Sequence, residues 1–376
     1  MEGTAYKKIT WFHQMADQNN QRNTWRKLKR NKAAVAGMII IAIALVTALF
    51  AHMLAPDRSP DANRMILEIG GEKPGYTQQF LLLPKQKEYK STSLMSDLAT
   101  GSEDRYQYVP ITGYVERGDS LIVQKYIDEG FTEKISYPFS ETRTGKKKYL
   151  IQKQVYYLGT DKYGRDILSR LIVGVRVSLS VGLITVIISL TIGILLGSLA
   201  GYFRGHIDNA IMWLINIIWS IPTLLLVFAI TLLLGKGYWQ VFIAIGLTMW
   251  VSVARLIRGQ VLIVREMEYV EAAKALGFSD GRIIFRHILP NVMGPVLVVA
   301  ASNFASAIVI EAGLSFLGVG VQPPQPSWGL MIKENYNFII THNPMLALAP
   351  GFAIMILVLA FNMLGSGLRD ALQVKE

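Results

Sequence analysis

Six blocks of apolar residues, each about as long as a membrane-spanning helix, limit what this chain can fold into more than any other feature. A helix needs about 20 residues to cross roughly 30 Å of hydrocarbon. Half of the chain (51%) is hydrophobic, and these residues gather in blocks instead of following an amphipathic period. We therefore expect an all-α polytopic membrane protein with six transmembrane helices, at about residues 33–54, 177–200, 210–234, 238–254, 292–309 and 345–364.

The positions of lysine and arginine predict the orientation of these helices. Residues 1–32 carry eight basic residues and the loop at 254–290 carries six, whereas the short loops on the opposite side hold little beyond Lys236 and Lys333. Basic residues in short loops mark the cytoplasmic side. Both termini and the loop are therefore predicted to face the cytoplasm, in a cell membrane. The first apolar block is too long for a signal-peptide core, so we expect it to stay attached.

The basic segment 1–32 precedes the first span, residues 33–55. Its Trp25 stands among lysines and arginines, which fits a short helix at the lipid headgroups. A disordered basic tail is the alternative. Anchoring beside the membrane is favoured over binding of nucleic acid.

A polar insert, residues 56–157, separates the first span from the core, residues 158–376. It holds 15 basic and 14 acidic residues, and loops of this length cross a membrane largely regardless of charge. Alternating patches at 106–115, 120–127 and 149–157, punctuated by Gly and Pro, predict a small β-rich extracytoplasmic domain. A structural cap and a docking site for a partner are equally compatible with this pattern.

The composition argues against an enzyme. The chain has no cysteine, so disulfides and thiol chemistry are excluded, and its five histidines are scattered, so no metal site is predicted. No Gly-x-x-x-x-Gly-Lys-Ser/Thr stretch occurs to cradle a nucleotide. Its Ser, His and Asp residues form no set organised for hydrolysis. We expect a transport subunit without a cofactor of its own.

The loop 254–290 has the pattern of a charged helical hairpin between two spans. Residues 269–276 are predicted to form a helix that Gly277 stops. Ser279 or Asp280 then caps a second short helix, and Pro290 restarts the chain as the fifth span.

Three residues of this hairpin suit contact with another protein. Glu271 offers a charged anchor, and the small side chains of Ala272 and Ala273 admit a close approach. An ordinary solvated hairpin is the alternative interpretation.

Two stretches resemble a known family. Glu271-Ala272-Ala273, Gly277 and Leu289-Pro290 are in register with the coupling loop (the EAA motif) of the membrane subunits of binding-protein-dependent ABC importers, with His287 in place of the usual Ile. The sequence LGTDKYGRDILSR, from 158 to 170, resembles a signature of the C-type permease of oligopeptide and dipeptide importers (OppC/DppC-like). Trp25 through Pro56, Trp328-Gly329 and Leu368-Arg369-Asp370 extend this resemblance over the chain, except for the early tail and the insert.

The resemblance implies a type I importer fold, a set of partners and a mechanism. The partners would be a related B-type permease, two cytoplasmic ATPases that bind ATP and Mg²⁺, and an extracytoplasmic substrate-binding protein. The chain would form half of a translocation pathway for oligopeptides or dipeptides. The residues that couple it to an ATPase would be Glu271, Ala272, Ala273, Gly277, Leu289 and Pro290.

Two alternatives to peptide import stay open. The same scaffold could carry nickel chelates or antimicrobial peptides. An ion-driven secondary transporter is less favoured, because such carriers place charges at mid-membrane and interrupt helices in repeated halves.

Further residues are candidates for packing or for the substrate path. Gly193, Gly197 and Gly201 recur every four residues and predict close approach of another helix, within this subunit more than across an interface. Pro222 is expected to kink the third span, either to shape the path or as plain curvature.

Glu311 lies about 30 Å along the fifth span from Pro290, near the outer boundary. Beside a gate, it could meet a peptide amine or pair with Arg176. A carboxylate that snorkels to the interface is the alternative.

Overall fold

The structure is a computed structural model of the chain, and it describes residues 24–85, 94–139, 150–341 and 343–372. The chain forms two compact units. The helical unit comprises Met1–Ala44, Ser180–Glu311 and Met355–Glu376, and the sheet unit comprises Leu45–Leu179 and Ala312–Ile354. Most of the predicted segment 1–32 lies outside the described residues.

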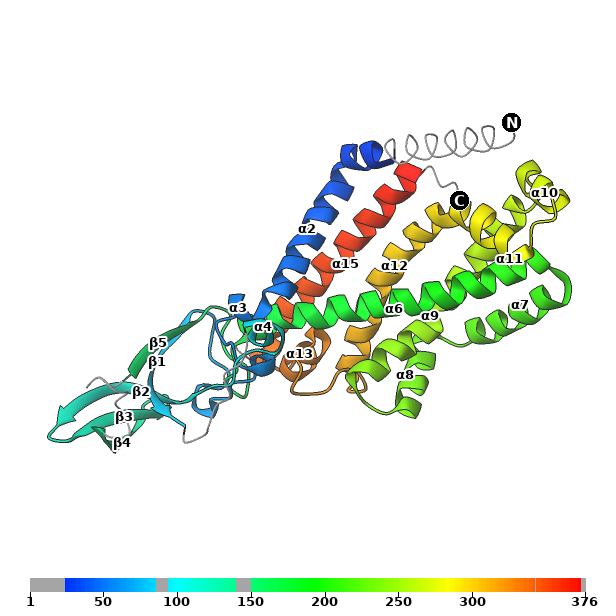
Figure 1. The fold of residues 1–376 in the computed structure, drawn as a ribbon. Coiled ribbons are helices and arrows are strands. Elements are labelled where there is room, and N and C mark those ends of the chain that lie inside the picture. Colours follow the sequence, from blue (N-terminus) through cyan, green and yellow to red (C-terminus); the bar gives the residue numbers. More distant parts are fainter. Residues whose placement is uncertain (1–23, 86–93, 140–149, 342, 373–376) are drawn as a thin grey trace. The chain divides into compact units, whose positions relative to one another are not determined.

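Five helical segments of the described chain are long and apolar enough to cross a membrane (Figure 1). They match five of the six predicted blocks. The segments are α2 (Lys32–Leu49), α6 (Ile167–Phe203), α9 (Tyr238–Val264), Asp280–Phe316, which ends in α12 (Leu289–Phe316), and α15 (Met345–Leu372). Four of them extend beyond the predicted bounds, because the helices continue into polar flanks, whereas α2 ends at Leu49, before the predicted residue 54.

The remaining block, the third in the chain, was predicted as one span at 210–234, but it is broken. It consists of α7 (Gly205–Ser220) and α8 (Thr223–Leu234), which meet at an angle of 95°. Pro222 stands at the break and is the N-cap residue of α8. A proline has no N–H to donate and its ring clashes with the preceding turn, so it kinks or breaks a helix, and here the helix is broken. The bent pair makes six spans if it counts as one.

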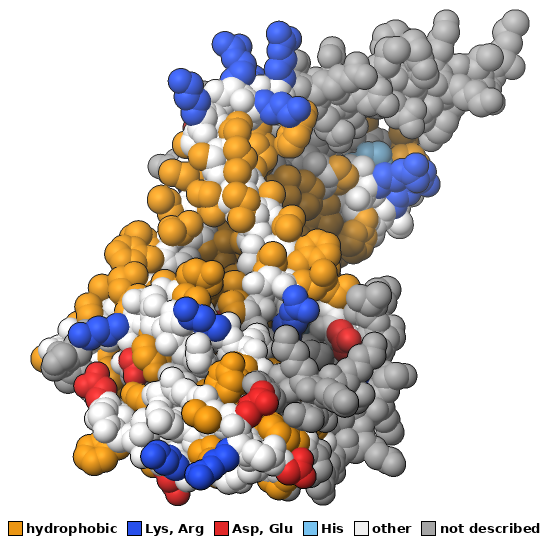
Figure 2. Space-filling model, turned by 90° about the vertical axis from the view of Figure 1, so that its left-hand side faces the viewer, with side chains coloured by type: hydrophobic (Ala, Val, Ile, Leu, Met, Phe, Trp, Pro, Cys, Tyr) orange, Lys and Arg blue, Asp and Glu red, His pale blue; other side chains and the backbone are white. Residues whose placement is uncertain are grey.

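The first and last helices pack directly against each other within the helical unit. A β-carbon placed on Gly37 of α2 would lie 2.6 Å from the carbonyl oxygen of Ala360 in α15. At the end of the pair, Asn31 Nδ2 donates to Asp370 Oδ2 over 3.1 Å. The opposite side of α2 exposes apolar residues such as Ile39 and Ile43, and Figure 2 shows hydrophobic side chains along this face with Lys and Arg gathered at one end.

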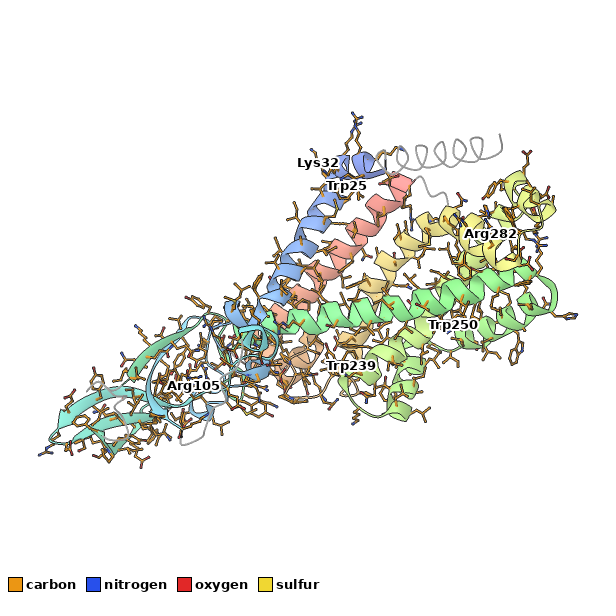
Figure 3. All side chains as sticks on the ribbon, viewed as in Figure 1. Trp25, Lys32, Arg105, Trp239, Trp250 and Arg282 are labelled. Carbon is orange, nitrogen blue, oxygen red and sulfur yellow. The ribbon has the colours of Figure 1, made fainter. Side chains whose placement is uncertain are left out.

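A short helix over residues 24–30 precedes α2. Its Trp25 is half exposed, and the Lys29 ammonium lies 5.1 Å from the Trp25 ring centroid. Figure 3 labels Trp25 and Lys32 at this end of the chain. An exposed tryptophan beside lysines and arginines is typical of a membrane–water boundary.

The sheet unit holds one five-stranded antiparallel sheet in the order β4-β3-β2-β1-β5. The strands are β1 (Tyr76–Pro84), β2 (Tyr106–Arg117), β3 (Ser120–Asp128), β4 (Phe131–Pro138) and β5 (Leu150–Tyr156). The alternating patches at 106–115, 120–127 and 149–157 coincide with β2, β3 and β5 in the described residues. Alternate side chains cover each face: Leu81, Val109 and Val123 pack on one side and Phe80, Leu82 and Tyr156 on the other.

Short helices complete this unit. They are α3 (Ala51–Leu54), η1 (Pro60–Ala62), η2 (Leu67–Ile69), α4 (Leu94–Thr100), α13 (Trp328–Asn335) and α14 (Phe338–Thr341).

The charges of the segment 158–170 are buried in the sheet unit. Arg165 Nε donates to Asp161 Oδ2 over 2.6 Å and its Nη2 to Glu334 Oε2 over 2.7 Å, while Arg170 lies 3.5 Å from the same carboxylate. Both arginines are almost completely inside the protein. Within this unit Arg165 thus pairs with two acids, Asp161 and Glu334, and Ile167 then begins α6.

Candidate functional site

The loop between α9 and the helix that starts at Asp280 is shorter than predicted. The sequence placed it at 254–290, but α9 continues to Val264 and the next long helical segment begins at Asp280. Arg255 and Arg258 therefore lie on α9. The Arg258 guanidinium donates to both carboxylate oxygens of Asp208 over 2.5 and 2.7 Å, and Arg255 stacks 3.4 Å from the Trp219 ring centroid. These contacts with α7 let the helix continue through charged positions.

The loop contains the helix α10 (Glu268–Ala275). Glu268 and Glu271 occupy its first turn. Carboxylates there stabilise the helix, because they interact with the partial positive charge at its N-terminus. The helix ends at Gly277, whose φ is +76°. The Gly277 N–H donates to the Lys274 carbonyl over 2.9 Å and the Phe278 N–H to the Ala273 carbonyl over 3.2 Å. This is a Schellman motif, which needs a residue that tolerates positive φ.

One face of α10 is buried in the chain's own core. Val270 and Ala273 pack in a cluster with residues of α9, α11 (Asp280–Ile283) and α12. Ala273 is only 4% exposed, so its small size serves packing within the subunit. The sequence had suggested that both alanines admit another protein, but Ala273 is not available for such a contact.

The other face of α10 is open. Glu271, Ala272, Lys274 and Gly277 are exposed, and Leu276 is 74% exposed. The sequence analysis did not single out Leu276. No local signal marked it, because its neighbours Ala275 and Gly277 are small and uncharged. The role of this face in coupling stays a prediction.

The helix after the loop runs through Pro290 without a restart. The chain is helical from Asp280 to Phe316, with a π-helical turn, η3 (Ile284–Ile288), before α12. The prediction that Pro290 begins the fifth span is therefore wrong. It cannot donate to the carbonyl four residues earlier, and the preceding π-turn, in which the Leu289 N–H reaches the Ile284 carbonyl, changes the pairing at this point. Leu289 is half buried and Pro290 is exposed.

The loop is tied to the end of α6. The Tyr202 hydroxyl donates to Asp280 Oδ1 over 2.6 Å, and Arg265 Nη1 donates to the Tyr202 carbonyl. The Lys274 ammonium lies 5.1 Å from the Tyr202 ring centroid. A displacement of α10 would therefore act directly on α6, α9 and α12, which it contacts.

The three glycines of α6 lie against α9. A β-carbon on Gly193 would lie 2.5 Å from Val253 Cβ, one on Gly197 would lie 2.5 Å from the Ala254 carbonyl oxygen, and one on Gly201 would lie 2.8 Å from the Arg258 carbonyl oxygen. No real β-carbon tolerates the two shortest distances. The glycines thus allow two helices of the same subunit to approach backbone to backbone.

The candidates near the outer side lie in different surroundings. Glu311 is 1% exposed, so it does not snorkel out of the chain. Arg176 donates to the carbonyls of Ala48 (2.6 Å), Leu49 (3.2 Å) and Leu98 (2.6 Å). Ala48 and Leu49 are the last residues of α2, and a basic group at a helix C-terminus stabilises the helix by bonding carbonyls that have no partner within it. The gate role of Glu311 and its pairing with Arg176 stay predictions.

The helical unit also contains a cavity, lined by hydroxyl and apolar side chains, that the sequence analysis did not single out. It has a volume of about 250 Å³ and lies where α7, α8, α9 and α12 meet. Hydroxyl groups within apolar blocks could have indicated it, because such groups favour a protein interior or a wet path over lipid. Its polar lining residues include Trp219, Thr223, Thr248, Ser252 and Ser306.

The described residues include no group of three His, Asp or Glu side chains arranged to hold a metal ion. What the site offers is a charged helix with one face fixed in the core and the other exposed.

Comparisons with known proteins agree with this arrangement. Residues 193–375 match the model of the binding-protein-dependent transport system inner membrane component, and residues 21–67 match the N-terminal TM domain of oligopeptide transport permease C. The insert strands lie between these two stretches.

Two curated relatives are similar over more than two thirds of their length. The dipeptide transport system permease protein DppC of Alkalihalophilus pseudofirmus is 44% identical over 220 residues, which are 58% of this chain and 72% of the relative. The glutathione transport system permease protein GsiD of Pectobacterium atrosepticum is 40% identical over 58% of this chain and 73% of the relative.

Among solved structures, the MetNI methionine ABC transporter in inward facing conformations is similar, with 19% identity and a TM-score of 0.46, over 56% of this chain and 98% of that chain. The matched models and the curated relatives decide the family. The chain belongs to the inner membrane components of binding-protein-dependent transport systems, the permease subunits of ABC transporters.

Proposed function

We propose that this chain is one of two permease subunits of an ATP-driven importer of short peptides. Its partners are a related B-type permease, two cytoplasmic ATPases that bind ATP and Mg²⁺, and an extracytoplasmic substrate-binding protein. The two relatives reported above are named for transport of dipeptides and of glutathione, which is itself a short peptide. Peptides are therefore the cargo class that both similarities support.

The observation that carries the proposal is the open face of α10. Glu271, Ala272 and Leu276 stand on a helix whose other face is fixed in the core and whose end is set by a Schellman motif. A rigid, exposed helix of this kind suits insertion into a cleft of an ATPase. Closure of the ATPases then moves α10 and, through Tyr202 and Asp280, the ends of α6 and α12.

The orientation follows from charge. The exposed basic residues of the helix 24–30 and those around α10 belong on the cytoplasmic side, so both termini are cytoplasmic and the sheet is extracytoplasmic. The sheet, in the insert 56–157, is then positioned to help seat the substrate-binding protein. The core 158–376 carries the pathway and the coupling loop.

The test is reconstitution of the chain with its partners and measurement of ATP-dependent uptake of peptides, nickel complexes and sugars. Glu271→Arg reverses the anchoring charge on the exposed face, so we expect uptake to fall at least about tenfold, which corresponds to ~1.4 kcal/mol, while the chain still inserts in the membrane. Lys27→Glu, a charge reversal of equal size on the helix 24–30, serves as the control. Normal uptake by an assembled Glu271→Arg complex would show that α10 does not couple transport to ATP.

A further inference from the structure

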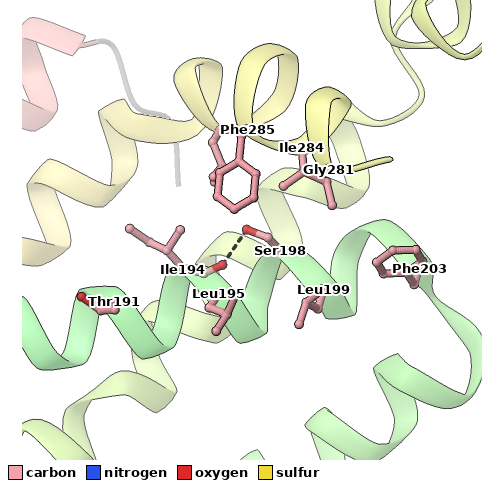
Figure 4. Close-up of a pocket in the computed structure, with 10 residues that line it drawn as sticks. Thr191, Ile194, Leu195, Ser198, Leu199, Phe203, Gly281, Ile284 and Phe285 are labelled. Carbon is pink, nitrogen blue, oxygen red and sulfur yellow. Dashed lines mark hydrogen bonds between the residues drawn. The ribbon is translucent and has the colours of Figure 1, made fainter. Parts of the chain in front are cut away.

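An apolar groove lies on the helical unit between the end of α6 and the helical turns that follow the loop (Figure 4). Its volume is about 440 Å³, within the range of roughly 300–1,000 Å³ in which proteins hold small ligands. Leu195, Leu199 and Phe203 line it from α6, and Ile284 and Phe285 line it from η3.

The groove offers almost no polar group to a ligand. The Ser198 hydroxyl donates to the Ile194 carbonyl over 2.5 Å, the bond drawn in Figure 4, and the Thr191 hydroxyl donates to the Ile187 carbonyl over 2.7 Å. Both hydroxyls are thus used within α6. Phe203 and Phe285 remain 42% and 67% exposed, so a ligand for this groove must be a hydrocarbon.

Two arginines stand directly beside the groove. Arg282 and Arg286 each follow a lining residue, Gly281 and Phe285, and both are exposed. Arg282 stacks 4.3 Å from the Phe278 ring centroid, and in the described part of the chain neither arginine has an ion pair with an acid. Figure 3 labels Arg282 in this region.

Asp280, the acid closest in sequence to Arg282, accepts the Tyr202 hydroxyl. Glu268 and Glu271 lie on α10 and, among the described residues, form no ion pair with either arginine. The positive charge beside the groove is therefore left for a partner of opposite sign.

The length of the groove along α6 is close to the hydrocarbon thickness of one leaflet of a bilayer. Its lining on α6 runs from Thr191 to Phe203, roughly 18 Å along the helix, and half of the hydrocarbon thickness is roughly 15 Å. Arg282 and Arg286 lie beside this stretch, next to its lining residues Gly281 and Phe285. Basic pockets between helices on the cytoplasmic side are a known way to bind anionic lipids.

We propose that the groove binds an anionic phospholipid of the cytoplasmic leaflet, with an acyl chain between α6 and η3 and the phosphate against Arg282 and Arg286. The leaflet rests on the orientation proposed above, but the binding itself does not depend on the cargo. Lipid at this place would support the packing of η3 beside the coupling loop.

Photo-crosslinking tests the proposal. The full chain is reconstituted in phosphatidylcholine nanodiscs with a small share of phosphatidylglycerol that carries a diazirine on one acyl chain, and labelled peptides are mapped by mass spectrometry. Labels are expected in 191–203 and 281–289. The same diazirine on phosphatidylcholine should label these peptides far less, since each arginine near an anionic surface is worth about fivefold in affinity and the pair about thirtyfold.

Three variants separate the contributions. Gly281→Leu places a side chain in the groove, and a β-carbon there meets nothing within 4 Å, so the helix is preserved and labelling should be lost. Arg282→Gln with Arg286→Gln should remove the preference for phosphatidylglycerol. Gly259→Leu, in equally open space on α9, is the matched control and should label as the unaltered chain does.

The outcomes are distinct. Labelling that survives Gly281→Leu, or that is equal for both lipids, would overturn the proposal. So would cross-links from these peptides to the second permease in the assembled complex, because a protein would then cover the groove. Failure of peptide uptake would bear on the proposed function alone, since no arm of this experiment measures transport.

Discussion

Glu334 is the acidic partner of two arginines in the interior of the sheet unit. Its Oε2 lies 2.7 Å from Arg165 Nη2 and 3.5 Å from Arg170 Nη2. Its loss removes the acidic partner of the buried Arg170 and leaves Arg165 paired with Asp161 alone, and breaking a buried ionic group in this way costs about 3–5 kcal/mol. We expect Glu334→Ala to destabilise the chain by this amount, as measured by thermal unfolding in detergent. Its exposed neighbour Lys333 gives the control, Lys333→Ala, and equal melting of the two variants would contradict the network.

Glu72 gives the sheet unit a defined response to pH. Burial, followed by the nearby charge of Glu129, raises the pKa of its carboxyl above the ordinary 4.5. A raised pKa means that the folded state binds this proton more tightly than the unfolded state does. The contribution of Glu72 to the free energy of unfolding is therefore fully present below pH 4.5 and is lost as the pH rises through the pKa of the folded state. Glu72→Gln keeps the group neutral. It should therefore raise the melting temperature at pH 7 and leave it almost unchanged at pH 4, and the same shift at both values would refute the argument.

The stop of α10 depends on the backbone of one residue. Gly277 has a φ of +76° and nothing within 4 Å of an added β-carbon, so the cost of substitution there is conformational and not steric. A β-branched residue at positive φ costs at least about 1–2 kcal/mol, whereas asparagine visits this region more readily. We expect Gly277→Val to expose the amides of 268–276 to faster hydrogen exchange and to reduce uptake, and Gly277→Asn to do so much less. Equal exchange in the two variants would show that the motif does not fix the helix.

The elements that the sequence predicted well are those with strong local signals. Apolar blocks located α2, α6, α9, α12 and α15, and alternation located β2, β3 and β5. Pro222 indicated a kink, yet a bend of 95° depends on the packing of α7 and α8 and has no local signature.

The elements that were placed less well depend on contacts between distant residues. The predicted fourth span ended directly before Arg255, yet α9 continues past Arg258, which pairs with Asp208, 50 positions earlier in the chain. The inward direction of Ala273 and the burial of Arg165 likewise follow from tertiary packing, which no local pattern reveals.

At the scale of the whole molecule, the sheet can be removed while the ionic network of Asp161, Arg165, Arg170 and Glu334 is kept. Tyr76 and Tyr156 are paired at the end of β1 and β5, so a short Gly/Ser linker can join them in place of 77–155. This keeps Asp57, whose N–H donates to Ser169 Oγ over 2.8 Å. If the sheet seats the substrate-binding protein, uptake should require more of that protein to reach half its maximum, while basal ATP turnover of the complex persists. An unchanged concentration dependence would leave the sheet as a structural cap.

The contact between α2 and α15 joins residues 339 positions apart, Asn31 and Asp370. During synthesis, α2 is made long before α15, the helix that covers its inner face. At about 10 residues per second, roughly half a minute separates the two. For that interval, the glycine-containing face of α2 has no neighbour from α15, so the helical unit cannot complete its fold until α15 has been made. A chain that lacks α15 should therefore expose this face of α2 and be removed by membrane proteases, even though every other span is intact.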